Sequence, residues 1–271
     1  VTIGDFNWDV TLTYAQNDNE VIELVEGLDE ISLGGLSTIP FVAVPGQPLG
    51  VFKATVAKET PDGRTIVDNN GIPKDASEKE VIGSWMYDYM LGGSTTLSWK
   101  NLSLFASFDY RKGGLIYSRT TDLEYFVGNI PQTTYNDRRP FIVPNSVTES
   151  GTGDDIVYEE NTIPISKENM DDFYQDGAFD RASSFLLPRD FFKLRELALT
   201  YSLPSSILAD TPIRDVSFSL IGRNLFLWTP AENNTIDPEI ASDGNDLSGR
   251  YGEFLANPTT KQWGGSLRFS F

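Results

Sequence analysis

The stretch WGGSLRFSF, residues 263–271, alternates between two kinds of side chain. One parity carries four apolar residues and a glycine: Trp263, Gly265, Leu267, Phe269 and Phe271. The other parity carries glycine, two serines and Arg268. Successive side chains of a strand point to opposite faces, so this pattern predicts a strand with one apolar and one polar face. Something apolar must cover the first face.

The same alternation recurs upstream. FNWDVTLTYA (6–15), LSLFASFDY (102–110), FKLRELALTYSL (192–203) and VSFSLIGRNLFLW (216–228) each place most of their apolar residues on one parity. The sequence therefore predicts an all-β, antiparallel fold with about seven long strands. We expect them near residues 6–15, 20–26, 90–99, 102–111, 192–203, 216–228 and 263–271.

The predicted connections alternate in length. Short ones fall at 16–19, 100–101 and 204–215, and long ones at 27–89, 112–191 and 229–262. Compact domains seldom carry structureless loops longer than about 15 residues. Outer-membrane β-barrels combine short turns on one rim with long extracellular loops on the other. The pattern favours a transmembrane β-barrel segment, and a soluble β-sandwich that binds a ligand is the alternative.

Composition limits the function classes. The chain has 39 acidic and 21 basic residues, a formal charge of −18, so it should repel nucleic acid. It has no histidine and no cysteine, so it cannot build Ser-His or Cys-His nucleophile arrangements. We expect no enzymatic activity, no cofactor and no metal. The oxygen-rich ASDGNDLSG (241–249), with Asp243, Asn245 and Asp246, fits turn chemistry better than a calcium site.

Several motifs, taken in order, resemble one family. FFKLRELALTYSLPSSIL (191–208), VSFSLIGRNLFLWTP (216–230), IDPEI (236–240) and the terminal WGGSLRFSF are similar to segments near the C-terminus of the SusC/RagA-like TonB-dependent transporters. Upstream, VPGQPLGVFKA (44–54), DNNGIPKD (68–75) and DRRPFIVPNSV (137–147) resemble loop segments of the same family. The resemblance implies that residues 1–271 form the C-terminal part of a 22-stranded barrel. By the same resemblance, we expect the plug domain and the TonB box to be absent from this chain.

The same resemblance implies a function and partners. Such a protein lies in the Gram-negative outer membrane and imports oligosaccharides or peptides, and the sequence does not distinguish the two. Its partners would be the plug and upstream strands of the same transporter, a SusD-like lipoprotein lid, TonB through the missing N-terminal region, and outer-membrane lipid. Phe271 would be read by the barrel-assembly machinery. A porin-like structural barrel without a TonB link is a further alternative.

One loop carries the candidate ligand-binding residues. Residues 113–190 hold 14 acidic and 6 basic side chains. Within them, TTYNDRRPF (133–141) concentrates Tyr135, Asn136, Asp137, Arg138 and Arg139. Tyr135 could stack on a sugar ring, while its four neighbours hydrogen-bond hydroxyl or peptide groups. The alternative is that Arg138 and Arg139 pair with loop carboxylates and fix the loop shape.

The alternation also assigns faces. We predict that one set faces lipid and a second set faces the lumen. The lipid set is Leu199, Tyr201, Phe218, Leu220, Leu267 and Phe269; the lumen set is Thr200, Ser217, Ser219, Ser266 and Arg268. An arginine on the lipid face would cost about 2–4 kcal/mol at the midplane, which is why Arg268 is placed inside.

Overall fold

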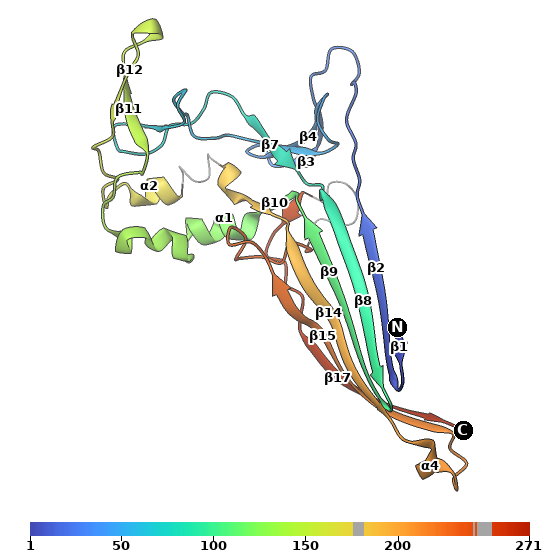
Figure 1. Cartoon of the computed structure of the whole chain (residues 1–271). Coiled ribbons are helices and arrows are strands. Elements are labelled where there is room, and N and C mark those ends of the chain that lie inside the picture. The colour runs from blue at the N-terminus through green and yellow to red at the C-terminus, as the bar shows by residue number, and fades with distance from the viewer. Residues whose placement is uncertain (176–181, 241, 243–250) are drawn as a thin grey trace.

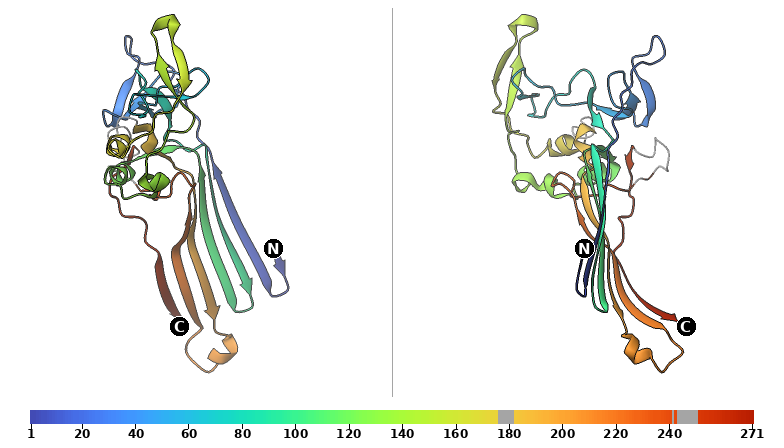
Figure 2. Two further views of the ribbon diagram at one scale, coloured as in Figure 1. Left: turned by 90° about the vertical axis from the view of Figure 1, so that its left-hand side faces the viewer. Right: turned by 45° about the vertical axis from the view of Figure 1, so that its right-hand side comes forward.

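A long antiparallel sheet dominates the computed structural model, which describes residues 1–175, 182–240, 242 and 251–271. Within these residues the sheet has seven strands in the order β1-β2-β8-β9-β14-β15-β17. They are β1 (Thr2–Ile3), β2 (Phe6–Ala15), β8 (Tyr89–Trp99), β9 (Leu102–Lys112), β14 (Phe191–Ser202), β15 (Asp215–Trp228) and β17 (Gln262–Ser270). The sheet is curved and open, with β1 and β2 at one edge and β17 at the other (Figures 1 and 2).

One predicted strand is wrong. Residues 20–26 are irregular, and the seventh member of the sheet is the two-residue β1. In EVIELVE the glutamates recur every third residue, so the segment has no period of two. It meets other backbone near Val21, which donates to the Gln47 carbonyl and accepts from Gly46. The expected turn at 16–19 is therefore also wrong, and the first long connection runs from 16 to 88.

The pairing register builds continuous rows of like side chains across the sheet. One row joins six strands in the order Phe6, Trp99, Leu102, Tyr201, Phe218 and Leu267. The next row joins Asn7, Ser98, Ser103, Thr200, Ser219 and Ser266. Successive rows lie on opposite faces, so the sheet has an apolar face and a polar face.

A β-bulge interrupts this alternation in β14. The register shifts between Leu194 and Glu196 against both neighbouring strands. Against β9 the extra residue is Arg195, whereas against β15 the extra residue lies in β15, where Asn224 and Leu225 stand against Arg195. Before the bulge Leu194 shares the apolar face, and after it Leu197 does. The extra residue thus lets Lys193, Arg195 and Glu196 follow closely on one strand without placing a charge in the apolar band.

The three long connections leave from the same end of the sheet and fold there (Figure 1). They carry three small sheets in the described residues, β3-β4-β5-β7, β12-β11-β6 and β13-β10-β16. The strands are β3 (Ile31–Gly35), β4 (Pro40–Ala43), β5 (Val51–Ala54), β6 (Thr65–Val67), β7 (Glu80–Ser84), β10 (Leu115–Ser118), β11 (Ser146–Ser150), β12 (Val157–Glu160), β13 (Leu186–Pro188) and β16 (Gly252–Glu253). The helices are α1 (Arg119–Phe126), η1 (Pro131–Arg138), η2 (Gly153–Asp155), α2 (Met170–Tyr174) and η3 (Ala182–Phe185). At the opposite end α4 (Ser205–Leu208) joins β14 to β15.

The hydrophobic core lies among these connections and not on the large sheet. Its buried members come from all three of them: Ile39, Phe41, Phe52 and Ala54; Tyr117, Ala182, Phe185 and Leu186; and Tyr251. The Tyr251 hydroxyl donates to the Ile39 carbonyl at 3.0 Å and accepts from the Leu36 amide at 3.1 Å. Gly35 permits this approach, because a Cβ there would lie 2.7 Å from Tyr251.

A second contact joins two of the connections at the start of α1. Ser118 caps this helix by accepting from the Thr121 amide. The Ser118 hydroxyl donates to Glu253 at 2.6 Å, and the Thr120 hydroxyl donates to the same carboxylate at 2.7 Å. A carboxylate at a helix N-terminus is favoured by the helix dipole. None of the helices among the described residues has the length and hydropathy needed to span a membrane.

Candidate functional site

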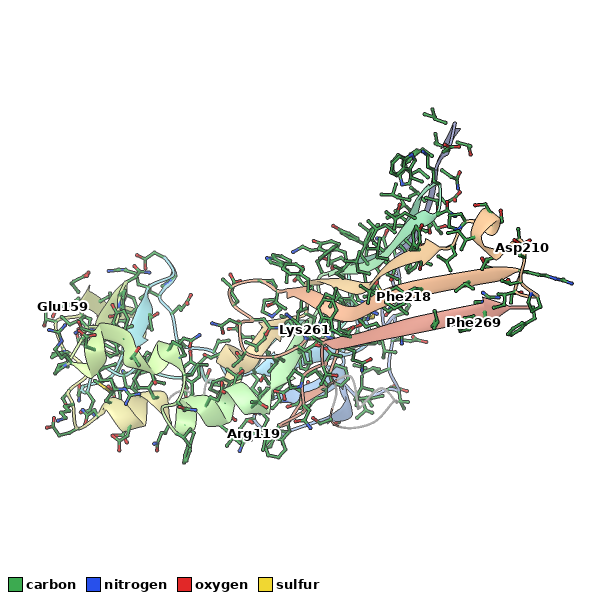
Figure 3. All side chains as sticks on the ribbon, turned by 90° about the horizontal axis from the view of Figure 1, so that it is seen from below. Arg119, Glu159, Asp210, Phe218, Lys261 and Phe269 are labelled. Atoms are coloured by element: carbon green, nitrogen blue, oxygen red, sulfur yellow. The ribbon has the colours of Figure 1, made fainter. Side chains whose placement is uncertain are left out.

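The apolar face of the sheet is a broad exposed surface. The residues predicted to face lipid are all exposed there: Leu199, Tyr201, Phe218, Leu220, Leu267 and Phe269. Phe218 and Phe269 lie on the neighbouring strands β15 and β17 (Figure 3). The residues predicted for the opposite face lie across from one another on neighbouring strands. Ser217 is opposite Arg268, and Ser219 is opposite both Thr200 and Ser266. The register thus confirms the alternation, and large apolar side chains are exposed along neighbouring strands of one face. Contiguous exposed apolar surface of this kind marks a site of interaction with a membrane or another protein.

A buried ionic network lies on the polar face near the long connections. The Lys193 amine is 2.8 and 2.7 Å from the two carboxylate oxygens of Asp237, and 2.5 Å from Glu239. Lys193 and Asp237 are 1% and 3% exposed, so this pair is shielded from solvent. Thr259 donates to Asp237 as well. Residues from both ends of the 229–261 connection, Asp237 and Thr259, are therefore held at β14.

Arg195, the bulge residue, completes the network. Its guanidinium donates to Glu239 at 2.6 and 2.5 Å, a two-pronged contact, and to Asp109 of β9 at 2.6 Å. Burial raises the pKa of Glu239, but hydrogen bonds from Arg195 and Lys193 outweigh it and lower the pKa to about 2. Glu239 is thus ionised throughout the physiological range. The carboxylates of Asp237 and Glu239 are therefore already paired within the protein. The network fixes the position of residues 237–239 and does not form a ligand site.

An aromatic cavity of about 520 Å³ lies between the first and second long connections, with β6 on the first and helices α1, η1 and α2 on the second. Its aromatic lining residues are Tyr125, Tyr135, Phe141, Phe173 and Tyr174. Tyr135 and Phe141 meet edge to face with ring centroids 4.9 Å apart, and Phe141 meets Phe173 in the same way at 5.5 Å. Burial raises the pKa of Tyr125 and of Tyr174, so both hydroxyls remain protonated at neutral pH. A volume of this size is typical of small-ligand sites.

The five predicted ligand-binding residues lie together on η1 and the residue after it, but only Tyr135 lines this cavity. Asn136 donates to the Pro140 carbonyl at 3.0 Å, and Arg138 donates to the Gly128 carbonyl at 2.7 Å. Arg139 pairs with Asp137 at 2.9 Å, and both side chains are exposed. These contacts match the alternative in which the arginines fix the loop shape, except that Arg138 uses backbone carbonyls instead of carboxylates.

The remaining predicted sites are Phe271 and the oxygen-rich segment 241–249. Phe271 follows the last residue of β17 and is exposed. Asp243, Asn245 and Asp246 lie outside the described residues. Among the described residues, no group of three acidic side chains is placed to hold a metal ion.

Sequence reasoning missed the ionic network. Asp109, Lys193 and Arg195 lie on strands in which charges are rare, and their pairing with residues more than forty positions away cannot be read from alternation. One signal was present. The apolar positions of FFKLREL change parity between Leu194 and Leu197, which indicates an extra residue at Arg195.

Comparisons with known proteins agree on one relationship. No family model matches the chain. The chain is 21% identical to TonB-dependent receptor P3 and 24% identical to TonB-dependent receptor P26, both of Formosa agariphila, over 92% and 91% of its length. The solved RagAB peptide transporter superposes with a TM-score of 0.65 at 21% identity, covering 100% of this chain and 28% of that one. The RagAB peptide importer in its open-open state gives a TM-score of 0.62, with 27% of that chain covered.

The chain resembles the SusC/RagA-like TonB-dependent transporters. It spans about a quarter of the length of the curated relatives it matches. The likeness to the solved structures shows the fold, in which an open sheet carries long folded connections at one end. The relatives are named as receptors and transporters, not as enzymes.

Proposed function

We propose that the chain is the C-terminal barrel segment of an outer-membrane, TonB-dependent importer of oligosaccharides or peptides. The single observation that carries this proposal is the exposed apolar face, which continues in register across six long strands. Such a face suits the lipid side of a barrel strand, and the polar opposite face suits a lumen. In the part of the chain that is described, no second sheet packs on the apolar face, which disfavours the soluble β-sandwich.

The open edges support a larger assembly. Among the described residues, β17 has a partner only on the β15 side, and β2 is covered on its outer side only by the two residues of β1. Unpaired backbone groups cost several kcal/mol each in hydrocarbon, so open edges do not persist there. Both edges would pair with other strands of the same transporter, and the plug and the TonB-binding segment would belong to that upstream portion.

The folded connections would form the extracellular face and meet a SusD-like lipoprotein lid. Their outermost point in Figure 1 is the β11–β12 hairpin, whose turn, residues 151–156, carries the exposed Ile156. Replacing residues 151–156 by Gly-Asn should weaken binding of the purified lid by about tenfold, the effect of losing one anchoring side chain. Unchanged lid binding would remove this hairpin from the interface.

Cysteine labelling tests the membrane assignment. Leu220 and Ser219 are neighbours on β15 with opposite orientations, so they form a matched pair. In outer membranes that contain the full-length protein, Leu220→Cys should react with a lipid-soluble maleimide and Ser219→Cys with a charged, water-soluble one. Equal reaction of both with the charged reagent would favour a soluble module.

Import itself needs a separate measurement. A strain that lacks the gene should lose uptake of one class of oligosaccharide or oligopeptide, and loss of TonB should give the same defect. A porin-like structural barrel would show neither dependence.

A further inference from the structure

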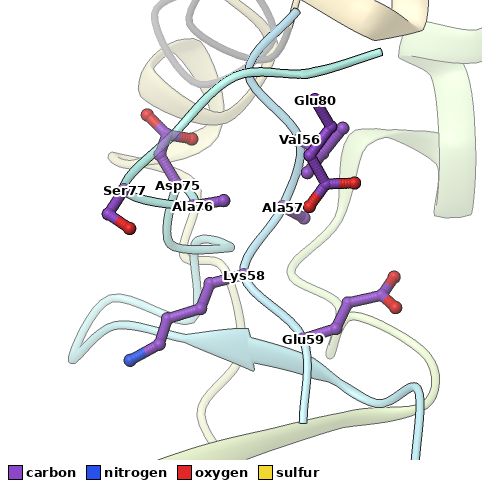
Figure 4. Close-up of a pocket in the computed structure, with 8 residues that line it drawn as sticks. All are labelled: Val56, Ala57, Lys58, Glu59, Asp75, Ala76, Ser77 and Glu80. Atoms are coloured by element: carbon purple, nitrogen blue, oxygen red, sulfur yellow. The ribbon is translucent and has the colours of Figure 1, made fainter. Parts of the chain in front are cut away.

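Two cavities share a wall in the folded connections. The aromatic cavity described above has Ala57 and Thr65 on one side and the aromatic rings on the other. A second cleft, of about 620 Å³, lies between residues 56–59 and 75–80 and is also lined by Ala57 (Figure 4). The two cavities therefore meet at Ala57.

The lining of the aromatic cavity favours an apolar side chain over a sugar. None of its described lining residues is charged, and its polar groups are few. The Gln132 carbonyl accepts from the Tyr174 hydroxyl, so this oxygen already has a partner. A sugar would bury hydroxyls with few partners here, and an unpaired buried polar group is costly. An aromatic side chain would instead extend the edge-to-face packing of Tyr135, Phe141 and Phe173.

The neighbouring cleft has the opposite character. Glu59, Asp75 and Glu80 line it against a single lysine, Lys58. The Lys58 amine binds both carboxylate oxygens of Glu149 at 2.9 and 2.8 Å, and in Figure 4 it points away from Glu59 and Glu80. The lysine charge is thus directed to Glu149, and the carboxylates of the cleft on which the argument depends are those of Glu59 and Glu80.

We propose that these cavities bind an oligopeptide in which an aromatic residue is next to a lysine or arginine. In an extended peptide, successive residues are about 3.3 Å apart along the backbone and their side chains point in opposite directions. One side chain can therefore enter the aromatic cavity while the next contacts the carboxylates. This proposal rests on the proposed import function and specifies a class of cargo for it. It is consistent with the overall charge of −18.

Peptide binding to the purified full-length transporter in detergent tests the proposal. The probe is fluorescein-labelled Gly-Lys-Phe-Lys-Gly, followed by fluorescence anisotropy at low salt. Replacing its phenylalanine by alanine should weaken binding by about tenfold or more, because the buried apolar area is lost. Replacing its lysines by glutamates should abolish binding, and raising the salt concentration should weaken binding of the lysine peptide.

Protein variants locate the site. Ala57→Trp fills the shared wall, and Tyr135→Ala removes an exposed ring without disturbing the core; each should weaken the probe about tenfold. Glu59→Gln combined with Glu80→Gln should remove most of the salt dependence. Glu23→Gln combined with Glu26→Gln is the matched control, since it removes two exposed acids of the same connection away from both cavities.

Different failures are distinguishable. If the transporter imports some substrate but the probe does not bind, or binds equally well to Ala57→Trp and Tyr135→Ala, the peptide site is wrong and the import function stands. If the purified lid, and not the peptide, binds in a manner sensitive to Tyr135→Ala, the cavities are a partner site and the cargo proposal is wrong. If no TonB-dependent uptake exists at all, the proposed function itself fails.

Discussion

The Lys193 amine contacts both carboxylate oxygens of Asp237, 44 residues away, in a site from which solvent is almost excluded. Lys193 lies on strand β14 of the large sheet, and Asp237 lies in the third long connection. Two charges buried in this way stabilise the fold only as a pair, because each alone would carry the full cost of desolvation. The pair therefore fixes where the connection meets the wall.

Removing one partner should be strongly destabilising. We expect Lys193→Met to cost about 3–5 kcal/mol, since it leaves Asp237 buried and unpaired. Thermal unfolding of the full-length protein, followed by its heat-modifiable migration on gels, measures this. Lys261→Met is the control, because Lys261 is exposed. The double variant Lys193→Met with Asp237→Leu should recover much of the loss; equal effects of the two lysine variants would contradict the buried pair.

Acid should release the third connection. The pKa of Glu239 falls from an ordinary value of 4.5 to about 2 in the folded protein, so its stabilising contribution is complete above about pH 4.5 and is lost as the pH falls toward 2. Hydrogen exchange of residues 236–240 should be flat from neutral pH down to about 5, after correction for the intrinsic rate, and rise below it. Glu239→Gln should expose this segment already at neutral pH. Protection that persists unchanged at pH 2 would argue against the ion pair.

The two faces of β15 should respond oppositely to an added charge. Phe218→Arg places a guanidinium in the apolar band, where the cost reaches about 2–4 kcal/mol at the membrane midplane and is smaller toward the interfaces. Ser219→Arg, one residue on, reaches the polar face and should cost much less. The folded fraction in outer membranes reports both variants. If Ser219→Arg proved the more damaging substitution, the assignment of faces would be reversed.

The hydroxyl of Tyr251 should matter more than its position in the chain suggests. Tyr251→Phe leaves the Ile39 carbonyl and the Leu36 amide without this partner, which should cost about 1–3 kcal/mol. Proteolysis of the turn at residues 36–39 should become faster. Tyr14→Phe removes an exposed hydrogen bond to Gln16 and should have little effect, so it serves as the comparison.

Strands with strict alternation of apolar and polar residues could be predicted from the sequence. Segments without that alternation, and contacts between distant segments, could not. Residues 102–111 and 263–271 are strands as expected, because an amphipathic strand is written directly in its period of two. Residues 20–26 share the composition of a strand but not its period, and they are irregular. The pairs Lys193–Asp237 and Tyr251–Ile39 depend on how distant segments meet, which alternation does not encode. Tyr135 was identified from its residue type, while the cavity beside it requires Phe173 and Tyr174 to fold back onto η1.

The shared core of the three long connections has a consequence for protein engineering and for evolution. Ile39, Tyr117 and Tyr251 come from different connections but pack in one cluster, so none of these segments has an independent fold. Exchanging a single connection with that of a relative would leave mismatched surfaces on the other two. Changes of specificity at this end of the molecule should therefore arise through coordinated substitutions in all three segments, and chimaeras should succeed only when the three are transferred together.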